Sequence, residues 1–372
     1  MKLHLFAAAA IVFVVGAAVE GQQPGPQAVR SPEVATDRRV TFRIAAPKAA
    51  EVQLTCECFS GSKAMTKDDK GVWSVTLGPF EPDIYEYEFT IDGVTILDPR
   101  NEKVKYNGRP STISSLLEVP GSGPLFYDAR AVPHGSVDIR WYQSKAVNGT
   151  RRAHVYTPPN YDRGTSRLPV LYLLHGADGD DSAWAAFGHA NHTLDNLIAD
   201  KKMTTMVVVM PFGYAYPPAA GAAGDRQRTD FEKDLLQDLI PFVQANYRVL
   251  TDRSNRAIVG LSMGGGQALN IGLRHLDMFS RVASFSGAVP RGQAADSYND
   301  VLGDAKKLNT SLKLLWLGCG TEDGLFTPNK EFSERLKKAG VTHTFHESGG
   351  AHTWSVWRKY LLEVAPLLFP TT

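Results

Sequence analysis

Cysteine is scarce in this sequence, with three residues among 372: Cys56, Cys58 and Cys319. A small exported domain that depends on disulfides for stability needs more of them, so a disulfide scaffold is excluded. Cys56 and Cys58 are two apart in an expected strand, so we expect both as small buried apolar groups on one face. No His/Cys cluster has the spacing of metal ligands, and we expect neither a metal nor another cofactor.

The sequence also lacks an excess of either charge. Its 40 Lys and Arg oppose 39 Asp and Glu, which gives a formal net charge of +1. There is therefore no electrostatic reason to expect nucleic acid or an anionic membrane as a partner. The length is compatible with two domains, and the composition leaves the oligomeric state open.

The N-terminus has the features of a secretory signal peptide. Lys2 supplies a positive start, residues 5–15 are apolar, and the small residues 16–18 are followed by polar ones. The apolar run is too short to cross a bilayer comfortably, so we expect no stable membrane insertion. The sequence thus predicts a signal peptide over residues 1–21, cleaved somewhere around residues 18–21, and a secreted or periplasmic protein; a membrane anchor is the alternative.

A small all-β unit is predicted next. Residues 22–30, rich in Pro, Gln and Gly, are typical of a linker. Apolar and polar residues then alternate, most clearly over 85–91, where a hairpin turn at Asp92-Gly93 follows. The pattern predicts an immunoglobulin-like sandwich over residues 31–119. A Gly/Pro/Ser-containing linker, residues 120–132, follows it.

Residues 133–372 have a different pattern. Continuous apolar runs such as 170–174 and 206–210 indicate strands buried on both faces. They alternate with helical segments such as 230–247, as in a mostly parallel sheet covered by helices. The predicted fold class is α/β, an α/β-hydrolase fold. Because a linker separates the units, a chain starting near Ala129 is expected to fold on its own.

A candidate nucleophile lies in Gly260-Leu261-Ser262-Met263-Gly264, a G-x-S-x-G pattern. The pattern alone is common, and an incidental Gly-rich turn is the alternative. Here it follows the apolar strand 257–259 and opens a helical stretch, which is the setting of a nucleophile elbow. A serine hydroxyl is a weak nucleophile at neutral pH, so Ser262 needs a neighbouring base.

The chain order Ser, acid, His of this fold locates the partners. His352 follows the last expected strand and is favoured as the base over His343 and His346, which lie within that strand. Asp323 lies in the loop after the strand 312–317, and we prefer it to Glu322 as the group that accepts the histidine N–H.

An oxyanion hole requires two backbone N–H donors. The residue after the nucleophile, Met263, should supply one, and Ala177, in the loop after strand 170–174, is the candidate for the other. We expect His175 to position this loop rather than to act as a base.

Aromatic residues on loops near the same sheet edge are candidates for substrate contacts, with ordinary packing as the alternative for each. They are Trp184, Tyr214, Tyr216 and Trp354. Such rings would favour hydroxycinnamoyl over acetyl esters, because a flat aromatic acyl group needs an apolar slot. The loop 213–228 borders this region, and we assign it no role.

Several of these segments resemble a known family. Residues 171–176, 260–266, 318–326 and 349–357 are similar to the feruloyl esterases of carbohydrate esterase family 1, which are esterase D-like α/β-hydrolases. That group also includes acetylxylan esterases and enterobactin-esterase-like enzymes. The resemblance covers about residues 133–369. Residues 40–47, 71–73 and 85–99 resemble, less specifically, the early-set family 48 carbohydrate-binding modules. Trp73 lies mid-strand, so we expect it in the core rather than as a sugar platform.

The resemblance implies hydrolysis of feruloylated or acetylated xylan or oligosaccharide esters, with ferulate ahead of acetate and no cofactor. The alternatives are a siderophore esterase, a peptidase on the same fold, and a carbohydrate-binding protein with an inert hydrolase domain. An intact Ser, Asp and His set disfavours the last of these, and such peptidases usually carry a much larger accessory domain.

Overall fold

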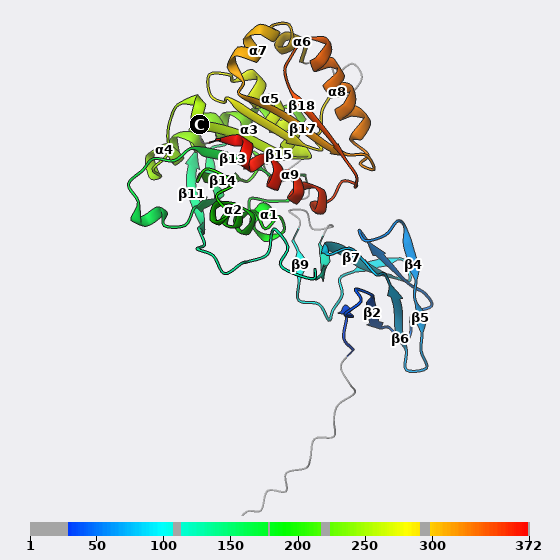
Figure 1. Ribbon diagram of the computed structural model, residues 1–372. Helices are drawn as coiled ribbons and strands as arrows, with labels where there is room; N and C mark the ends of the chain where they lie inside the picture. The colour runs from blue at the N-terminus through cyan, green and yellow to red at the C-terminus, as the bar shows by residue number, and fades with distance from the viewer. Residues whose placement is uncertain (1–28, 107–112, 178, 217–223, 291–297, 371–372) are drawn as a thin grey trace, which may run out of the picture.

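The computed structural model describes residues 29–106, 113–177, 179–216, 224–290 and 298–370. In these residues an all-β unit precedes a larger α/β unit (Figure 1). The expected signal peptide, 1–21, lies outside the described residues. Among the described helices, none combines the length and the apolar character that crossing a membrane requires.

The all-β unit consists of two sheets. The first has the order β1(Glu33–Val34), β2(Val40–Ala45), β6(Val72–Leu77), β5(Thr66–Lys67). The second has the order β4(Ser62–Ala64), β3(Val52–Cys56), β7(Asp83–Ile91), β10(Ser114–Val119), β9(Val104–Lys105), with β8(Val94–Ile96) paired to β7. All pairings within the two sheets are antiparallel.

The core of this sandwich follows from the alternation in its strands. In β7 the rings of Tyr87 and Phe89 are buried, whereas the intervening Glu86 and Glu88 lie on the other face of the sheet. Trp73 is also buried, at 8% exposed, as expected from its position within β6.

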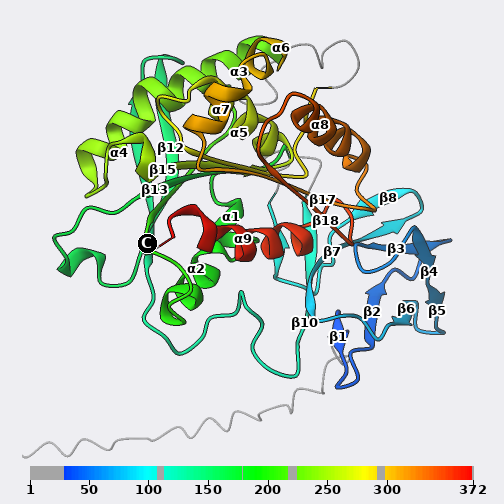
Figure 2. The same cartoon turned by 45° about the horizontal axis from the view of Figure 1, so that its top comes forward.

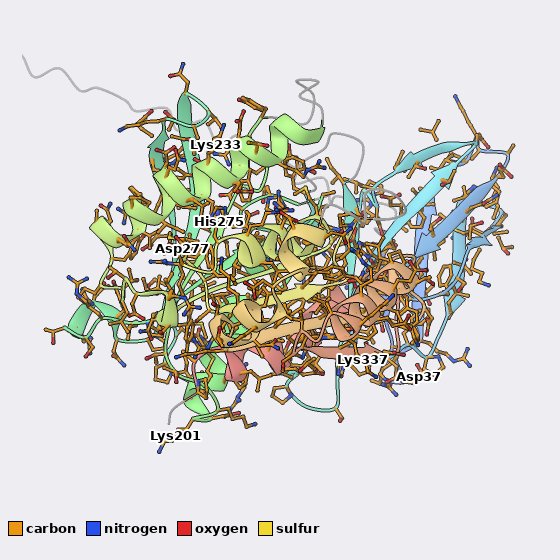
Figure 3. The ribbon with its side chains drawn as sticks, turned by 90° about the horizontal axis from the view of Figure 1, so that it is seen from above. Asp37, Lys201, Lys233, His275, Asp277 and Lys337 are labelled. Atoms are coloured by element: carbon orange, nitrogen blue, oxygen red, sulfur yellow. A yellow bond between two sulfur atoms is a disulfide. The ribbon has the colours of Figure 1, made fainter. Side chains whose placement is uncertain are left out.

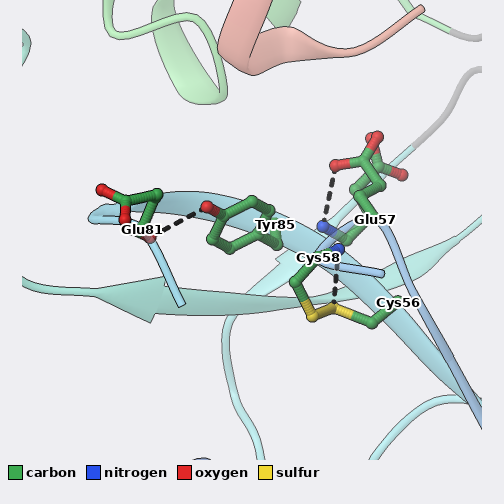
Figure 4. Close-up of a disulfide and its surroundings, with 6 residues drawn as sticks. Cys56, Glu57, Cys58, Glu81 and Tyr85 are labelled. Atoms are coloured by element: carbon green, nitrogen blue, oxygen red, sulfur yellow. Dashed lines mark hydrogen bonds between the residues drawn. A yellow bond between two sulfur atoms is a disulfide. The ribbon is translucent and has the colours of Figure 1, made fainter. Parts of the chain in front are cut away.

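The expectation that Cys56 and Cys58 are separate buried groups is wrong, because the structure joins them in a disulfide. Strand β3 ends at Cys56 and the chain turns there, so Cys58 does not continue the alternation of the strand. The turn instead brings the two sulfur atoms together (Figure 4).

The α/β unit is built on one mixed sheet. Its order is β11(Ser136–Ser144), β12(Gly149–Thr157), β14(Val207–Pro211), β13(Val170–Leu174), β15(Arg256–Leu261), β16(Arg281–Phe285), β17(Leu314–Gly320), β18(Thr344–Ser348). The pairings from β14 to β18 are parallel, and β11 and β12 add an antiparallel edge. Strands β13, β14, β15 and β16 are buried along their whole length, as the apolar runs predicted.

Helices cover both faces of this sheet (Figure 2). One face carries α3(Gly224–Lys233), the π-helical turn η3(Asp234–Leu239), α4(Ile240–Asn246), α5(Met263–Arg274), α6(Asn299–Leu302), α7(Ala305–Ser311) and α8(Phe326–Lys338). The other carries α1(Ala183–Ala186), α2(Ala190–Ala199) and α9(Trp354–Leu368). Charged side chains such as Lys201, Lys233 and Lys337 lie at the periphery when the molecule is seen from above (Figure 3). This is the predicted α/β-hydrolase arrangement.

A buried ion pair joins the two units. Arg358 of α9 is 1% exposed, and its guanidinium donates to a carboxylate oxygen of Asp83 at 2.5 Å and to the carbonyl of Ile84 at 3.0 Å. The hydroxyl of Tyr127, from the connecting segment, donates to the same carboxylate at 3.1 Å. The start of β7 is thereby fixed against the helix that follows the predicted base, His352.

Candidate active site

Ser262 occupies a sharp turn between β15 and α5. Its φ of 52° and ψ of −116° are strained for a residue with a side chain, at a cost of about 1–3 kcal/mol. A Cβ on Gly260 would lie 2.3 Å from the carbonyl oxygen of Gly264, and one on Gly264 would lie 2.5 Å from that of His175. Side chains at these two positions are therefore excluded, which explains why glycines flank the turn.

The structure brings the three predicted catalytic residues into a hydrogen-bonded chain. His352 Nε2 lies 2.9 Å from Ser262 Oγ, and His352 Nδ1 lies 2.8 Å from Asp323 Oδ2. The loops after β15, β17 and β18 supply the three residues, and the carboxyl ends of parallel strands meet at one edge of a sheet. The geometry is that of a nucleophile, its base and the group that orients the base.

The acid is enclosed by donors. The Asp323 side chain has no exposed surface, and its other oxygen accepts the Leu325 N–H at 2.7 Å. Burial opposes ionisation, yet hydrogen bonds from His352, the Leu325 amide and Ser286 outweigh it and keep the pKa of Asp323 below its usual value. Asp323 is therefore a carboxylate at neutral pH, able to stabilise a positive imidazolium.

The predicted oxyanion donors lie on either side of the nucleophile. Met263 is the first residue of α5, where backbone N–H groups have no partner within the helix. Ala177 and Gly176 line the same pocket as Ser262. A Cβ on Gly176 would lie 2.6 Å from Leu261 and 3.3 Å from the Ser262 Cβ, so glycine permits the close approach of this loop.

His175 connects two loops. Its Nδ1 lies 2.7 Å from the Gly176 carbonyl, and its Nε2 lies 2.8 Å from the Gly213 amide nitrogen. The carbonyl only accepts and the amide only donates, so the imidazole is neutral with its proton on Nδ1. Burial lowers its pKa, in agreement with this neutral form. His175 therefore holds the loop after β13 against the loop after β14, the positioning role expected for it.

Of the four aromatic residues expected near the substrate, one lines the pocket of Ser262. Trp354, 5% exposed, is among the lining residues. Trp184 is instead a core residue, 1% exposed, whose indole N–H donates to the Leu174 carbonyl. Tyr214 is 6% exposed, and its hydroxyl donates to the Ala177 carbonyl at 2.5 Å. Tyr216 lines a neighbouring cavity.

These differences arise because residues on a loop near a catalytic edge also pack under it. Within the loop 213–228, residues 217–223 lie outside the described part. Residues 224–228 begin α3.

The pocket has a volume of about 370 Å³. The α/β unit contributes Gly176, Ala177, Gly179, Leu261, Ser262, His352, Trp354 and Trp357 to its wall. Trp357, which the sequence reasoning missed, lies one helical turn after Trp354, and its ring meets the His352 imidazole edge-on at 4.9 Å. The i, i+3 spacing of the two tryptophans was the signal that could have identified it.

The opposite wall comes from the sandwich. It is formed by Glu57, Glu86, Glu88, Lys105 and Ser114. Lys105 is paired with Glu86, and the Ser114 hydroxyl donates to Glu88 at 3.2 Å. The pocket is therefore a joint product of both units, apolar on the side of the tryptophans and polar on the side of the sheet.

Glu57 is the most perturbed acid of this wall. It lies between Cys56 and Cys58, and one carboxylate oxygen accepts the Glu86 N–H at 3.0 Å (Figure 4). Glu57 is an exposed residue, and its place in the pocket wall removes its carboxylate in part from bulk water. This removal from bulk water and the nearby Glu86 carboxylate raise the pKa of Glu57 to about 7.

No group of three or more His, Cys, Asp or Glu in the described ranges could hold a metal ion. The chemistry that the site can perform is nucleophilic substitution through Ser262, assisted by an acid–base pair. A strained serine at a strand–helix turn, hydrogen-bonded to a histidine that is in turn bonded to a buried aspartate, is the arrangement of serine hydrolases with an α/β-hydrolase fold.

The particular family follows from comparison with known proteins. Residues 144–368 match the Esterase family, described as "Putative esterase", and the chain belongs to it. The chain is 32% identical over 355 residues to an endo-1,4-beta-xylanase/feruloyl esterase of Xylanibacter ruminicola, which covers 93% of this chain and 46% of that protein. An esterase of Mycobacterium tuberculosis is 26% identical over 277 residues, covering 61% and 59% of the two chains. The chain thus spans about half the length of these curated relatives.

Solved structures share the fold. The enterochelin esterase of Shigella flexneri superimposes with a TM-score of 0.70 at 19% identity, over 91% of this chain and 95% of that one. A CE1 ferulic acid esterase of Anaeromyces mucronatus does so with a TM-score of 0.57 at 22% identity, over 66% and 95%. The family and these relatives are named as esterases, which agrees with the chemistry that the site can perform.

Proposed function

We propose that the protein is an exported feruloyl esterase that releases hydroxycinnamates from plant-wall xylan by a Ser262–His352–Asp323 acyl-enzyme mechanism. The observation that carries the proposal is the hydrogen-bonded triad at the base of a pocket walled by Trp354 and Trp357. The 32% identity to a xylanase/feruloyl esterase supports the acyl group and the polymer.

Acylation begins when Ser262 Oγ attacks the ester carbonyl carbon. His352 Nε2 takes the hydroxyl proton, and the Asp323 carboxylate stabilises the resulting imidazolium through the Nδ1–H. The carbonyl oxygen becomes an oxyanion, for which the N–H groups of Met263 and Ala177 are the proposed donors. Collapse of this intermediate breaks the ester bond, and the imidazolium returns its proton to the departing sugar alkoxide.

Deacylation repeats the sequence with water. His352 removes a proton from the water as its oxygen attacks the acyl carbonyl, and the same N–H groups bind the second oxyanion. Collapse then expels Ser262 Oγ, which takes back a proton from His352. The products are the free acid and the regenerated enzyme, and neither half of the cycle needs a cofactor.

The walls of the pocket favour an aromatic acyl group. Edge-to-face or stacked contact with one indole is worth about 1 kcal/mol beyond its buried area. Two such contacts correspond to roughly a thirtyfold preference over an acetyl group, which reaches neither ring. The polar wall of the sandwich faces the same space and suits the hydroxyl groups of a sugar or of the acyl ring.

The same wall argues against the siderophore alternative. The wall carries Glu57, Glu86 and Glu88 against Lys105, so its formal charge is negative even with Glu57 protonated and becomes more negative when Glu57 ionises. An iron(III) catecholate complex is itself anionic, and like charges at close range repel. The likeness to the Shigella flexneri enzyme is one of fold.

The decisive experiment compares esters on the pure protein. We expect kcat/KM for methyl ferulate to exceed that for an acetyl ester of matched leaving group by about thirtyfold. Acetylated xylan and a catecholate siderophore complete the panel. Equal values, or a preference for acetyl, would leave acetylxylan esterase as the better assignment, and a preference for the siderophore would reverse the argument from charge.

Export and glycan binding belong to the same proposal. The signal-peptide features of residues 1–21 support transfer out of the cytoplasm, where a disulfide such as Cys56–Cys58 is maintained. The resemblance of the sandwich to family 48 modules supports a role in holding the polysaccharide. Detection of mature protein beginning near residue 22 in the medium or periplasm tests the first of these.

A further inference from the structure

A second cavity, of about 480 Å³, lies on the surface beside the active-site pocket. We call it the aromatic groove, and define it by Tyr106, Trp141, Phe212 and Tyr216 together with Arg152 and Asp180. Tyr106 is 57% exposed and Trp141 is 60% exposed. Aromatic rings that are this exposed and line one cavity are typical of a binding surface, whereas rings that stabilise the fold are buried in its core.

The walls of the groove and of the active-site pocket come close together along two stretches of chain. Lys105 lines the pocket, and the next residue, Tyr106, lines the groove. Gly179 lines the pocket, and the next residue, Asp180, lines the groove. Since consecutive Cα atoms are about 3.8 Å apart, the walls of the two cavities lie one residue apart both on the sandwich side and on the α/β side.

The floor of the groove is fixed by buried charges. Arg152 donates to both oxygens of Asp181, at 2.8 and 2.6 Å, and the Asp181 side chain is 1% exposed. His154 Nδ1 lies 2.6 Å from the same carboxylate. The guanidinium carbon of Arg152 lies 5.8 Å from the centre of the Trp141 ring, which gives the exposed indole a rigid neighbour.

The combination of exposed rings and polar groups matches one ligand chemistry. A pyranose has an apolar face of C–H groups that packs on an aromatic ring, and hydroxyl groups at its edge that bond to carboxylates and guanidinium groups. Asp180 and Arg152 supply these groups beside Trp141 and Tyr106. A net charge of +1 and the mixture of acid and base in the groove do not favour a strongly charged partner.

We propose that the aromatic groove binds the glycan chain of the ester substrate, with a sugar ring packed on Trp141 and Tyr106 while the esterified residue lies at Ser262. The proposal rests on the proposed function, because it requires an ester that decorates a polysaccharide. The closeness of the two cavities selects the occupant, since a chain attached to the reacting ester must leave the pocket somewhere.

The test compares substrates of increasing length with Trp141→Ala and Tyr106→Ala. On methyl ferulate both variants should keep the wild-type kcat/KM, because neither residue lines the pocket. On feruloylated xylo-oligosaccharides the gain in kcat/KM with chain length should fall by about five- to tenfold. Ile139→Ala is the matched control: Ile139 lies on the same strand, is 53% exposed and does not line the groove, so it should behave as wild type.

Binding of sugars without an ester tests the groove independently of which acyl group the enzyme prefers. Ser262→Ala protein should bind unesterified xylo-oligosaccharides by calorimetry, and Ser262→Ala/Trp141→Ala should bind at least fivefold more weakly. If wild type fails on ferulate but these affinities differ as stated, the proposed function fails and the groove survives. The proposal would be overturned if the two proteins bound xylo-oligosaccharides with equal affinity, or if the variants lost equal kcat/KM on short and long substrates. Binding of lipid vesicles or of a second copy of the chain through Trp141 would also overturn it.

Discussion

At the scale of single residues, reactivity depends on the hydrogen-bonded order of Asp323, His352 and Ser262. Ser262→Ala and His352→Ala should each lower kcat by about 10⁵- to 10⁶-fold, because nucleophile and base act as a unit. Asp323→Asn should cost about 10⁴-fold, since the amide favours the wrong imidazole tautomer. Active-site titration and steady-state kinetics on methyl ferulate measure these losses, with circular dichroism to show a retained fold. A Ser262→Ala protein with more than a few per cent activity would remove Ser262 from the mechanism.

The ionisation of Glu57 should make the stability of the protein depend on pH. Its folded pKa of about 7 lies above the ordinary 4.5, so the folded state holds this proton more tightly than the unfolded state. The tighter binding of this proton contributes to the free energy of unfolding. This contribution is complete below about pH 4.5, declines as the pH rises, and is lost above about pH 7. Glu57→Gln cannot ionise and keeps an oxygen for the Glu86 N–H. We therefore expect its Tm, relative to wild type, to be higher at pH 8 than at pH 5.

Other groups around Glu57 set the size of this effect. Glu86 raises its pKa, whereas Lys105 and Arg358 lower it. The matched control is Glu51→Gln, an exposed acid directly before β3 and outside the pocket, which should give the same Tm difference at both pH values. A Glu57→Gln protein whose Tm difference from wild type is independent of pH would show that Glu57 titrates as an ordinary surface acid.

At the scale of elements, the loops at the sheet edge are held by one another. Arg151 of β12 is 7% exposed; it donates to the carbonyls of Phe212, Tyr214 and Ala215 and pairs with Asp234 at 3.2 Å. Asp234 opens the π-helical turn η3 and also accepts the Tyr142 hydroxyl. The loop after β14 is thereby fixed, and through Tyr214 it supports the Ala177 peptide.

Tyr214→Phe tests this support. Removing the hydroxyl releases the Ala177 carbonyl, and a displaced oxyanion donor costs rate, so we expect kcat to fall about tenfold with KM little changed. Tyr216→Phe is the control, because its hydroxyl donates to Asp230 at 2.7 Å. Thermal unfolding should show similar stability for both. Equal kcat values for the two variants would mean that Ala177 is held without Tyr214.

The sequence predicted those parts of the site that depend on local pattern. Ser262, Asp323 and His352 each follow a strand, and the order of the strands places their ends at one edge. The alternation in β7 separated Tyr87 from Glu86 and Glu88, but no local pattern tells whether an outer face meets water or another unit. The same reason hid the juxtaposition of Tyr106 and Trp141, which come from different units and meet only in the folded chain.

At the scale of the whole molecule, the sandwich is part of the active site. Linker composition predicted two separable units, and each does have its own hydrophobic core. The contact between the two units couples them energetically, and the composition of the linker gives no sign of this. Arg358 on α9 reaches Asp83 at the start of β7, and the same strand carries Glu86 and Glu88 into the pocket wall. A change at the junction should therefore affect both stability and the shape of the pocket.

The final prediction measures this coupling. Asp83→Asn leaves Arg358 buried without its counter-charge, and breaking a buried pair typically costs about 3–5 kcal/mol. We expect a loss of about 3 kcal/mol in the free energy of unfolding by denaturant, because the amide oxygen still accepts one hydrogen bond.

A second ion pair, Arg130–Asp200, serves as the control, because it also joins the connecting segment to the α/β unit. Arg130 and Asp200 are joined at 2.9 Å, with side chains that are 35% and 31% exposed, so Arg130→Ala should cost far less stability than Asp83→Asn. If the units are coupled through Arg358, wild type should unfold in one transition, and Asp83→Asn should separate the sandwich from the α/β unit as an earlier step. Equal losses for Asp83→Asn and Arg130→Ala would show that the buried junction does not couple the units.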